Sequence, residues 1–355
     1  MSHSPIIAGI QQIGIGVPDV HKAFNWYRIH FGMDVPIFEE AAEANLMLPY
    51  TGGMPHKRHA ILALNMRGGG GFEIWQYTSR TPQYPFTEPS LGDYGLFCAR
   101  IKTVDVAGTF KFLQSKKVHL LSGLTKDPGG LETFYLKDPW NNIFQVVKSD
   151  SWFGNKGIRL TGGQAGCMIG VSDIEASKKF YGDILGYDTV VYDQEGVFED
   201  ISGLPGGERN VRRVLLRHSK PRAGAFSRLL GSSEIELVKA YGYEPRKIFE
   251  NRYWGDLGFI HLCYDITHQD AMKKRCAEKG HPYTVDSGTT FDMGEAAGRF
   301  SYIEDPDGTL IEFVETKRIP LLKKIGWYLN LDKRDATRPL PDWMLKTLGF
   351  SRVKD

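Results

Sequence analysis

A histidine and a glutamate in the last third of the chain are predicted to point into the protein interior. Both residue types can bind metals or transfer protons. His261 lies between Phe259 and Cys263 on one face of a predicted strand, because side chains alternate along a strand. In the strand predicted for residues 310–315, Glu312 falls on the apolar face. An imidazole and a carboxylate in an apolar core are costly unless they are paired or bound to a metal. The pattern therefore predicts a polar or metal-binding site.

The segment 258–315 contains the elements that must position these two side chains. It begins with the strand GFIHLCYDI, continues through the amphipathic helix HQDAMKKRCAEKG, and ends in the hairpin RFSYIEDPDGTLIEFVE. In the sequence DPDG, Pro306 fixes φ and Gly308 allows a positive φ, which is typical of a tight turn. The segment is thus predicted to be a strand, a helix and a strand hairpin.

An internal repeat extends this unit to most of the chain. Three residues recur at an offset of 154, namely Asp19, Tyr27 and Gly32 as Asp173, Tyr181 and Gly186. Glu73 in FEIWQY recurs as Glu236 at an offset of 163, and KDPWNNIFQVV recurs as EDPDGTLIEFV at 167. A changing offset with preserved order indicates a duplication with loop insertions. Each half holds the unit twice, so we expect four βαβββ modules, at about 6–80, 93–150, 160–245 and 256–316.

The modules predict an α+β fold of two tandem domains, residues 6–150 and 160–316, followed by a basic C-terminal tail. The tail, residues 317–355, holds ten Lys and Arg against four Asp and Glu. We expect a short helix within residues 339–350. It would place three apolar side chains against the body of the protein: Trp343, Leu348 and Phe350.

Composition excludes several functional classes. The chain has 355 residues, enough for about two domains, and its net charge of +2 gives no reason to expect nucleic acid. The four cysteines show no CxxC and no disulfide framework, which favours a reducing compartment. No signal peptide and no run of 18 apolar residues is present, so a soluble cytoplasmic protein without a membrane partner is expected.

The four modules, the acidic residue that starts the first helix, and the final DPDG-x-x-I-E motif resemble the vicinal-oxygen-chelate superfamily. This superfamily includes glyoxalase I, extradiol dioxygenases, epimerases and bleomycin-resistance proteins, and the resemblance covers about residues 6–316. It implies curved mixed sheets, each built by two modules around a cup. It also implies that each module offers one ligand position on its first strand and another on its last.

Transferring those positions leaves the pairing of the modules open. The ligand positions of the four modules, in chain order, are Gln12 and Glu73, Cys98 and Gln145, Gly166 and Glu236, and His261 and Glu312. Pairing the first module with the second gives a poor site. Pairing the third with the fourth gives Glu236, His261 and Glu312 with a gap at Gly166.

Pairing the first module with the fourth gives the set that we prefer: Gln12, Glu73, His261 and Glu312. It is the ligand set that eukaryotic glyoxalase I enzymes use, and two carboxylates would neutralise one divalent ion, whether Zn, Ni, Co, Mn or Fe. The remaining set, Cys98, Gln145, Gly166 and Glu236, is expected to hold no metal, with an Arg or water satisfying Glu236. Two simpler interpretations compete. His261 alone is typical of a satisfied core histidine, and a one-residue slip of the strand register would turn Glu73 and Glu236 to solvent.

The resemblance implies a divalent-metal-dependent lyase or isomerase of the glyoxalase type that acts on a small vicinal-oxygen substrate through a metal-stabilised enediolate. Glu312 and Glu73 are the expected catalytic bases. The alternatives are an Fe(II) extradiol-type dioxygenase, which needs a second His where the chain has Gly166, and a metal-free small-molecule binding or resistance protein. We expect a monomer or a homodimer.

Overall fold

Four βαβββ modules follow one another along the chain, as the repeat predicts. The computed structural model describes residues 4–154, 160–288, 291–293, 296–322 and 327–354. The first module comprises β1 (Ile6–Gly16), α1 (Val20–Phe31), β2 (Val35–Glu43), η1 (Leu48–Tyr50), β3 (Lys57–Leu64) and β4 (Gly71–Tyr77). The second comprises β5 (Gly95–Thr103), α2 (Val106–Ser115), β6 (His119–Leu120), β7 (Thr125–Lys126), β8 (Glu132–Lys137) and β9 (Ile143–Lys148).

The second half of the chain repeats this order. The third module comprises β10 (Thr161–Gly170), α3 (Ile174–Leu185), β11 (Thr189–Gly196), η2 (Glu199–Ile201), β12 (Val211–Arg217), α4 (Ser227–Leu230) and β13 (Glu234–Ala240). The fourth comprises β14 (Gly258–Thr267), α5 (Gln269–Glu278), β15 (Val285–Asp286), β16 (Phe291–Met293), β17 (Ala296–Glu304) and β18 (Leu310–Leu322). After it come β19 (Trp327–Asn330), α6 (Asp342–Lys346) and η4 (Thr347–Ser351).

The strands form two sheets, and each sheet takes one module from each half of the chain. One sheet has the order β15-β17-β18-β14-β1-β4-β3-β2, so the first and fourth modules share it. The other has the order β11-β12-β13-β10-β5-β9-β8-β6, so the second and third modules share it. The α+β fold with curved mixed sheets is confirmed. The sheets do not follow the two sequence halves, and the domain bounds 6–150 and 160–316 stay a prediction.

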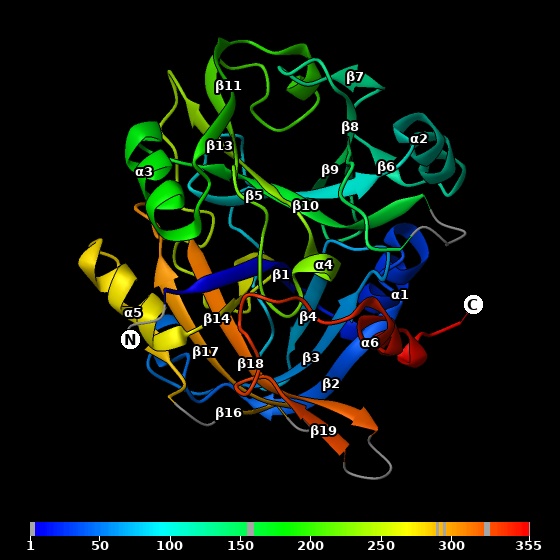
Figure 1. The fold of residues 1–355 in the computed structure, drawn as a ribbon. Helices are drawn as coiled ribbons and strands as arrows, with labels where there is room; N and C mark the ends of the chain where they lie inside the picture. The colour runs from blue at the N-terminus through cyan, green and yellow to red at the C-terminus, as the bar shows by residue number, and fades with distance from the viewer. Residues whose placement is uncertain (1–3, 155–159, 289–290, 294–295, 323–326, 355) are drawn as a thin grey trace.

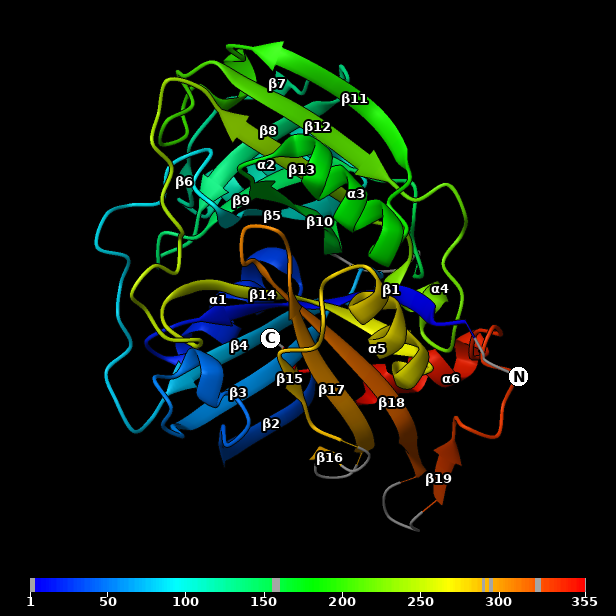
Figure 2. The same ribbon diagram turned by 90° about the vertical axis from the view of Figure 1, so that its left-hand side faces the viewer.

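A single apolar layer lies between the two sheets. Figure 1 shows the sheets one above the other, with α1 and α2 on one flank and α3 and α5 on the other; Figure 2 shows the same layers from the side. The largest buried cluster draws on both sheets and on these helices. It includes Ile13 and Ile15 of β1, Ile101 of β5, Phe144 of β9 and Phe259 of β14. One face of each sheet is thereby used for the core, and the opposite face is left for a cup.

Capping residues set the first and last turns of α1 and α3. The Asp19 carboxylate accepts a hydrogen bond from the Lys22 amide at 3.0 Å and so caps α1, while Asp173 caps α3 in the same way. Each of the two helices ends at a glycine with positive φ, Gly32 at 69° and Gly186 at 75°. The repeated residues therefore start and stop equivalent helices.

Two repeated tyrosines connect the sheets. The Tyr27 hydroxyl on α1 donates to Asp138 in the β8–β9 turn at 2.6 Å. The equivalent Tyr181 hydroxyl on α3 donates to Asp305 in the β17–β18 turn at 3.0 Å. Because α1 flanks one sheet and the β8–β9 turn belongs to the other, each buried pair holds the two layers in a fixed relation.

The C-terminal tail is part of the fold. β18 continues into the tail as far as Leu322, and β19 pairs with it antiparallel. The predicted short helix is present as α6. The prediction that Trp343 and Phe350 pack against the body is wrong, since they remain 64% and 87% exposed. The helix instead buries Leu345, and Leu348 packs as expected against the same apolar cluster beside β2 and β3.

Among the described residues, no helix combines the length and apolarity that a membrane crossing requires.

The paired tyrosines yield a prediction about stability. In Tyr27→Phe, the buried Asp138 carboxylate loses a hydrogen-bond donor, so we expect the free energy of unfolding to fall by about 1–3 kcal/mol. Urea denaturation followed by circular dichroism measures this loss. Tyr84→Phe, at a tyrosine that is 54% exposed, is the control and should change stability little. If Tyr27→Phe changed the free energy of unfolding no more than Tyr84→Phe does, the hydrogen bond between Tyr27 and Asp138 would contribute nothing to stability.

Candidate metal centre

The antiparallel pairing of β1 with β14 brings the predicted ligand positions together. Gly14 pairs with His261, and Gln12 pairs with Cys263. β4 lies on the other side of β1, in parallel, with Glu73 level with Gly14. β18 lies on the other side of β14, with Glu312 level with Cys263. Gln12, Glu73, His261 and Glu312 therefore stand on four adjacent strands, β4-β1-β14-β18.

The four side chains converge in space. The Nε2 atom of His261 lies 3.1 Å from Oε2 of Glu312 and 3.4 Å from Oε2 of Glu73. Nε2 of Gln12 lies 3.4 Å from the same Oε2 atom of each carboxylate. Ligand atoms about 2.0–2.2 Å from one tetrahedral ion are separated by about 3.3–3.6 Å. The donor atoms are thus spaced as they would be around a common cation.

Hydrogen bonding within this group is incomplete. Although Nε2 of His261 is close to two carboxylates, neither of its ring nitrogens reaches a described partner with hydrogen-bond geometry. The Oε1 atom of Gln12 also has no partner among the described residues. Rotating the Gln12 amide by 180° would exchange this oxygen for the nitrogen that now faces the carboxylates. Buried polar atoms left in this way fit a cation-binding group.

The electrostatics of the site favour a positive charge. Burial lowers the pKa of His261, but the negative charges of Glu312 and Glu73 outweigh burial and raise that pKa to about 9. Burial likewise acts to raise the pKa of Glu312, yet the charge of His261 brings it below its ordinary value. Two carboxylates therefore keep a proton on the imidazole at neutral pH. A divalent cation could replace that proton.

The surroundings of His261 depend on a glycine and two aromatic rings. A β-carbon on Gly14 would lie only 2.4 Å from Cε1 of His261, so the opposite strand leaves room for the imidazole. Trp254 stacks on the imidazole at 6.2 Å between centroids, and Tyr302 meets it edge-on at 5.5 Å. Tyr302 lies opposite Glu312 in the β17–β18 hairpin, so the hairpin register could have identified it. No sequence signal marks Trp254, which precedes β14.

The prediction that side chains alternate strictly between the two faces of the strand around His261 is wrong at one position. Gly14 pairs with His261 but the next residue of β1, Ile15, pairs with Phe259, so Ile260 is an extra residue in β14. Phe259 therefore packs in the core between the sheets. Ile260 instead packs in the cup, in the cluster that contains Trp254 and Tyr302, here called the aromatic cluster of the cup. A shift of this kind depends on the partner strand and cannot be read from periodicity.

The equivalent positions in the other sheet are occupied differently. Nε of Arg213 on β12 lies 2.7 Å from Oε1 of Glu236, and Nη1 of Arg213 lies 2.7 Å and 2.8 Å from the two carboxylate oxygens of Asp200. Burial tends to raise the pKa of Glu236, but the charges of Arg213 and Arg100 hold it below the ordinary value. The expectation that an Arg pairs with Glu236 is confirmed for its Oε1 atom, while Oε2 has no hydrogen-bond partner among the described residues. That this cup holds no metal stays a prediction, supported by the guanidinium.

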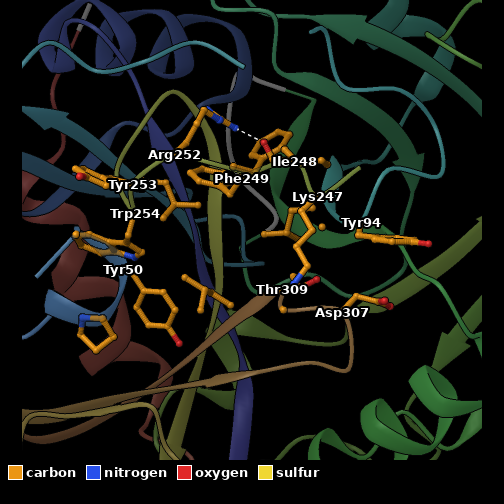
Figure 3. A pocket seen from close by; sticks show the side chains of 18 residues that line it. Tyr50, Tyr94, Lys247, Ile248, Phe249, Arg252, Tyr253, Trp254, Asp307 and Thr309 are labelled. Carbon is orange, nitrogen blue, oxygen red and sulfur yellow. Dashed lines mark hydrogen bonds between the residues drawn. The ribbon is translucent and has the colours of Figure 1, made fainter. Parts of the chain in front are cut away.

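A cavity of about 320 Å³ lies beside the cup that contains Gln12, Glu73, His261 and Glu312, here called the first cup. It is enclosed by the segment 247–254, by the turn at 307–310 and by Tyr50 and Tyr94, and Figure 3 shows these side chains around it. None of the four cup side chains, all of them described, lines this cavity. Trp254 lines it and also stacks on His261, so its indole is a wall between the cavity and the converging ligand positions.

The comparisons with known proteins agree with this architecture. The model of the Glyoxalase/Bleomycin resistance protein/Dioxygenase superfamily matches residues 9–146 and 163–313. No curated protein matches the chain in sequence. Glyoxalase I from Zea mays is 15% identical with a TM-score of 0.50, and the match covers 88% of this chain and 92% of that one. A putative dioxygenase from Bacillus subtilis is 11% identical with a TM-score of 0.56, over 98% and 97%.

The arginine of the second cup yields a prediction. Arg213→Met leaves the buried Asp200 without its paired cation and Glu236 with the more distant Arg100 alone, so we expect a loss of about 3–5 kcal/mol in the free energy of unfolding. The neighbouring Arg212, which pairs with Glu175 and Asp193 near the surface, is the matched control. Arg212→Met should cost at most about 1 kcal/mol. Chemical denaturation of both variants distinguishes a buried charge network from ordinary loss of a surface pair.

Proposed function

The chain belongs to the Glyoxalase/Bleomycin resistance protein/Dioxygenase superfamily, and from that premise we propose that it is a divalent-metal-dependent lyase or isomerase of the glyoxalase type. Its substrate would be a small molecule with two oxygens on neighbouring carbons. The proposal rests mainly on one observation: the convergence of Gln12, Glu73, His261 and Glu312 from the first and fourth modules.

The donor set supports one divalent ion. Two carboxylates, one imidazole and one amide oxygen suit Zn, Ni, Co, Mn or Fe and balance a charge of +2. When bound, such an ion stabilises the negative charge that develops on two neighbouring substrate oxygens. His261 and Gln12 would hold it as neutral ligands, and the ring of Trp254 would fix the orientation of His261.

The proton transfer is assigned to a carboxylate. We assign Glu312 as the base that takes a proton from the substrate carbon bearing one of the two oxygens, with Glu73 as the second carboxylate able to carry it. Burial and the loss of water strengthen the interaction of either carboxylate with charge in the site. Both keep a small accessible area, 8% of the Glu312 side chain and 12% of that of Glu73, so the group is not sealed.

The walls of the cup limit the size of the substrate. Aromatic rings surround the four polar side chains, chiefly Trp75, Tyr77, Trp254 and Tyr302. The loop between β2 and β3 crosses the cup, because the Tyr50 hydroxyl donates to the Glu304 carboxylate at 2.7 Å and accepts from the Thr284 hydroxyl at 2.7 Å. A substrate therefore needs apolar surface beside its two oxygens, and the adjoining cavity offers room for it once Trp254 shifts.

The donor set argues against the dioxygenase alternative. An Fe(II) extradiol site uses two His and one carboxylate as a facial triad. This cup contains one His with two carboxylates, and its other first-strand position holds Gln12 instead of a second His. The proton-transfer chemistry is therefore favoured over oxygen chemistry.

A metal-content measurement tests the site. His261→Ala removes the only nitrogen ligand, so we expect the protein reconstituted with Zn²⁺, Ni²⁺ or Mn²⁺ to lose one equivalent of metal per chain. Elemental analysis after gel filtration gives the stoichiometry. Glu315→Gln is the control, since Glu315 lies on β18 but accepts a hydrogen bond from the His268 amide instead of facing the cup. Unchanged metal content in His261→Ala would refute the assigned site.

An isotope experiment tests the base. Glu312→Gln keeps a ligating oxygen but removes the basic carboxylate, so we expect metal content to persist while turnover falls at least about 100-fold. With α-hydroxycarbonyl compounds in D₂O, NMR would follow deuterium incorporation at the carbon next to the carbonyl. Full exchange in Glu312→Gln with loss in Glu73→Gln would move the role to Glu73. Oxygen consumption with catechols, without any exchange, would favour the dioxygenase class.

A further inference from the structure

A second group of metal-ligand side chains lies outside the cup. It consists of His21 on α1, Glu39 on β2 and His59 on β3. Nε2 of His59 lies 3.0 Å from Oε1 of Glu39, and Nε2 of His21 lies 3.6 Å from the same oxygen. The two imidazole rings meet edge-on with centroids 5.1 Å apart. Three different elements thus direct their donor atoms to one point.

The spacing is close to that of ligands around a metal ion. Around a tetrahedral zinc ion, donors about 2.0–2.2 Å from the metal lie about 3.3–3.6 Å apart, and the two distances here are 3.6 Å and 3.0 Å, the shorter of which is also a hydrogen-bond distance. Both histidines present Nε2, the nitrogen farther from the backbone. Two imidazoles and one carboxylate form a ligand set that proteins use for zinc with a fourth position left for water.

Neighbouring cations do not compete for these ligands. Arg58, next to His59, pairs with Glu40 at 2.8 Å on the other face of the β2–β3 ribbon. Lys22, next to His21, pairs with Asp19 at 3.2 Å. Glu39 therefore has the two imidazoles as its ion-pairing neighbours among the described residues. The group is open to solvent, since the side chains of His21, Glu39 and His59 are 64%, 47% and 25% exposed.

This group is separate from the proposed catalytic cup. Ala60, the residue after His59, belongs to the aromatic cluster of the cup, and adjacent strand residues point to opposite faces. His59 therefore points to the face that α1 covers, away from Gln12, Glu73, His261 and Glu312. Nothing in the proposed reaction uses it.

We propose that His21, Glu39 and His59 bind one Zn²⁺ ion that joins α1 to the β2–β3 ribbon at the edge of the sheet. The ion has three protein ligands and a water in the fourth position. Because His21 is the second residue of α1 while Glu39 and His59 lie on paired strands, binding fixes the start of the helix against the sheet edge. The site stabilises the folded chain by an amount that grows with the logarithm of the free zinc concentration once that concentration exceeds the Kd.

Zinc titration of the metal-stripped protein tests this proposal. In a His261→Ala background, which removes the cup site, calorimetry should show one zinc equivalent and the melting temperature should rise with added ZnCl₂. Adding His21→Ala, His59→Ala or Glu39→Gln to that background should weaken zinc binding at least tenfold and abolish the rise. His119→Ala, at an exposed histidine on β6, should leave both intact.

The outcomes separate this site from the cup. Zinc binding and thermal shift that survive His21→Ala and His59→Ala in the His261→Ala background would overturn the surface site. If His261→Ala alone leaves the number of zinc ions bound per chain unchanged, the cup proposal fails. The His21 and His59 variants still decide the surface site in that case. Since His21 is exposed, its removal should not prevent folding, and circular dichroism of each variant checks this.

Discussion

The antiparallel pairing of β1 with β14 is the contact on which the rest of the structure depends. It joins the first module to the last across some 250 residues of sequence and makes one continuous sheet of the two. The equivalent contact between β5 and β10 builds the second sheet. Because the two sheets share one core, neither can form its cup unless the other half of the chain is already in place. The site and the fold are therefore specified by the same contact.

The first and third modules each place a carboxylate at the equivalent position of their last strand. The two cups compensate the negative charge of this carboxylate in different ways. Glu73 faces His261, Gln12 and Glu312, a group with excess negative charge that favours a cation. Glu236 faces the guanidinium of Arg213, which Asp200 also contacts. A buried charge must be compensated whichever solution is used. The second cup compensates its carboxylates with the permanent internal cation of Arg213, whereas the first cup has excess negative charge and no such arginine among the described residues that pair with Glu73 or Glu312.

An aromatic lining surrounds the buried polar group of the first cup. Trp254 and Tyr302 restrict the imidazole of His261, and Gly14 leaves the space that the ring needs. The rings exclude water, so charges in the cup interact strongly. The loop that crosses the cup is held by Tyr50 through hydrogen bonds rather than by apolar packing alone.

The sequence by itself determined the four modules, the helix caps at Asp19 and Asp173 and the turn at Gly308, because these depend on residues close together in the chain. It also supplied the four positions now found together, through the repeat. It left two pairings of modules open, and only β-sheet contacts between distant strands chose between them. The extra residue Ile260, the choice of Arg213 as partner of Glu236 and the outward orientation of Trp343 were likewise decided by tertiary structure. Each depends on neighbours that periodicity along one strand or helix does not specify.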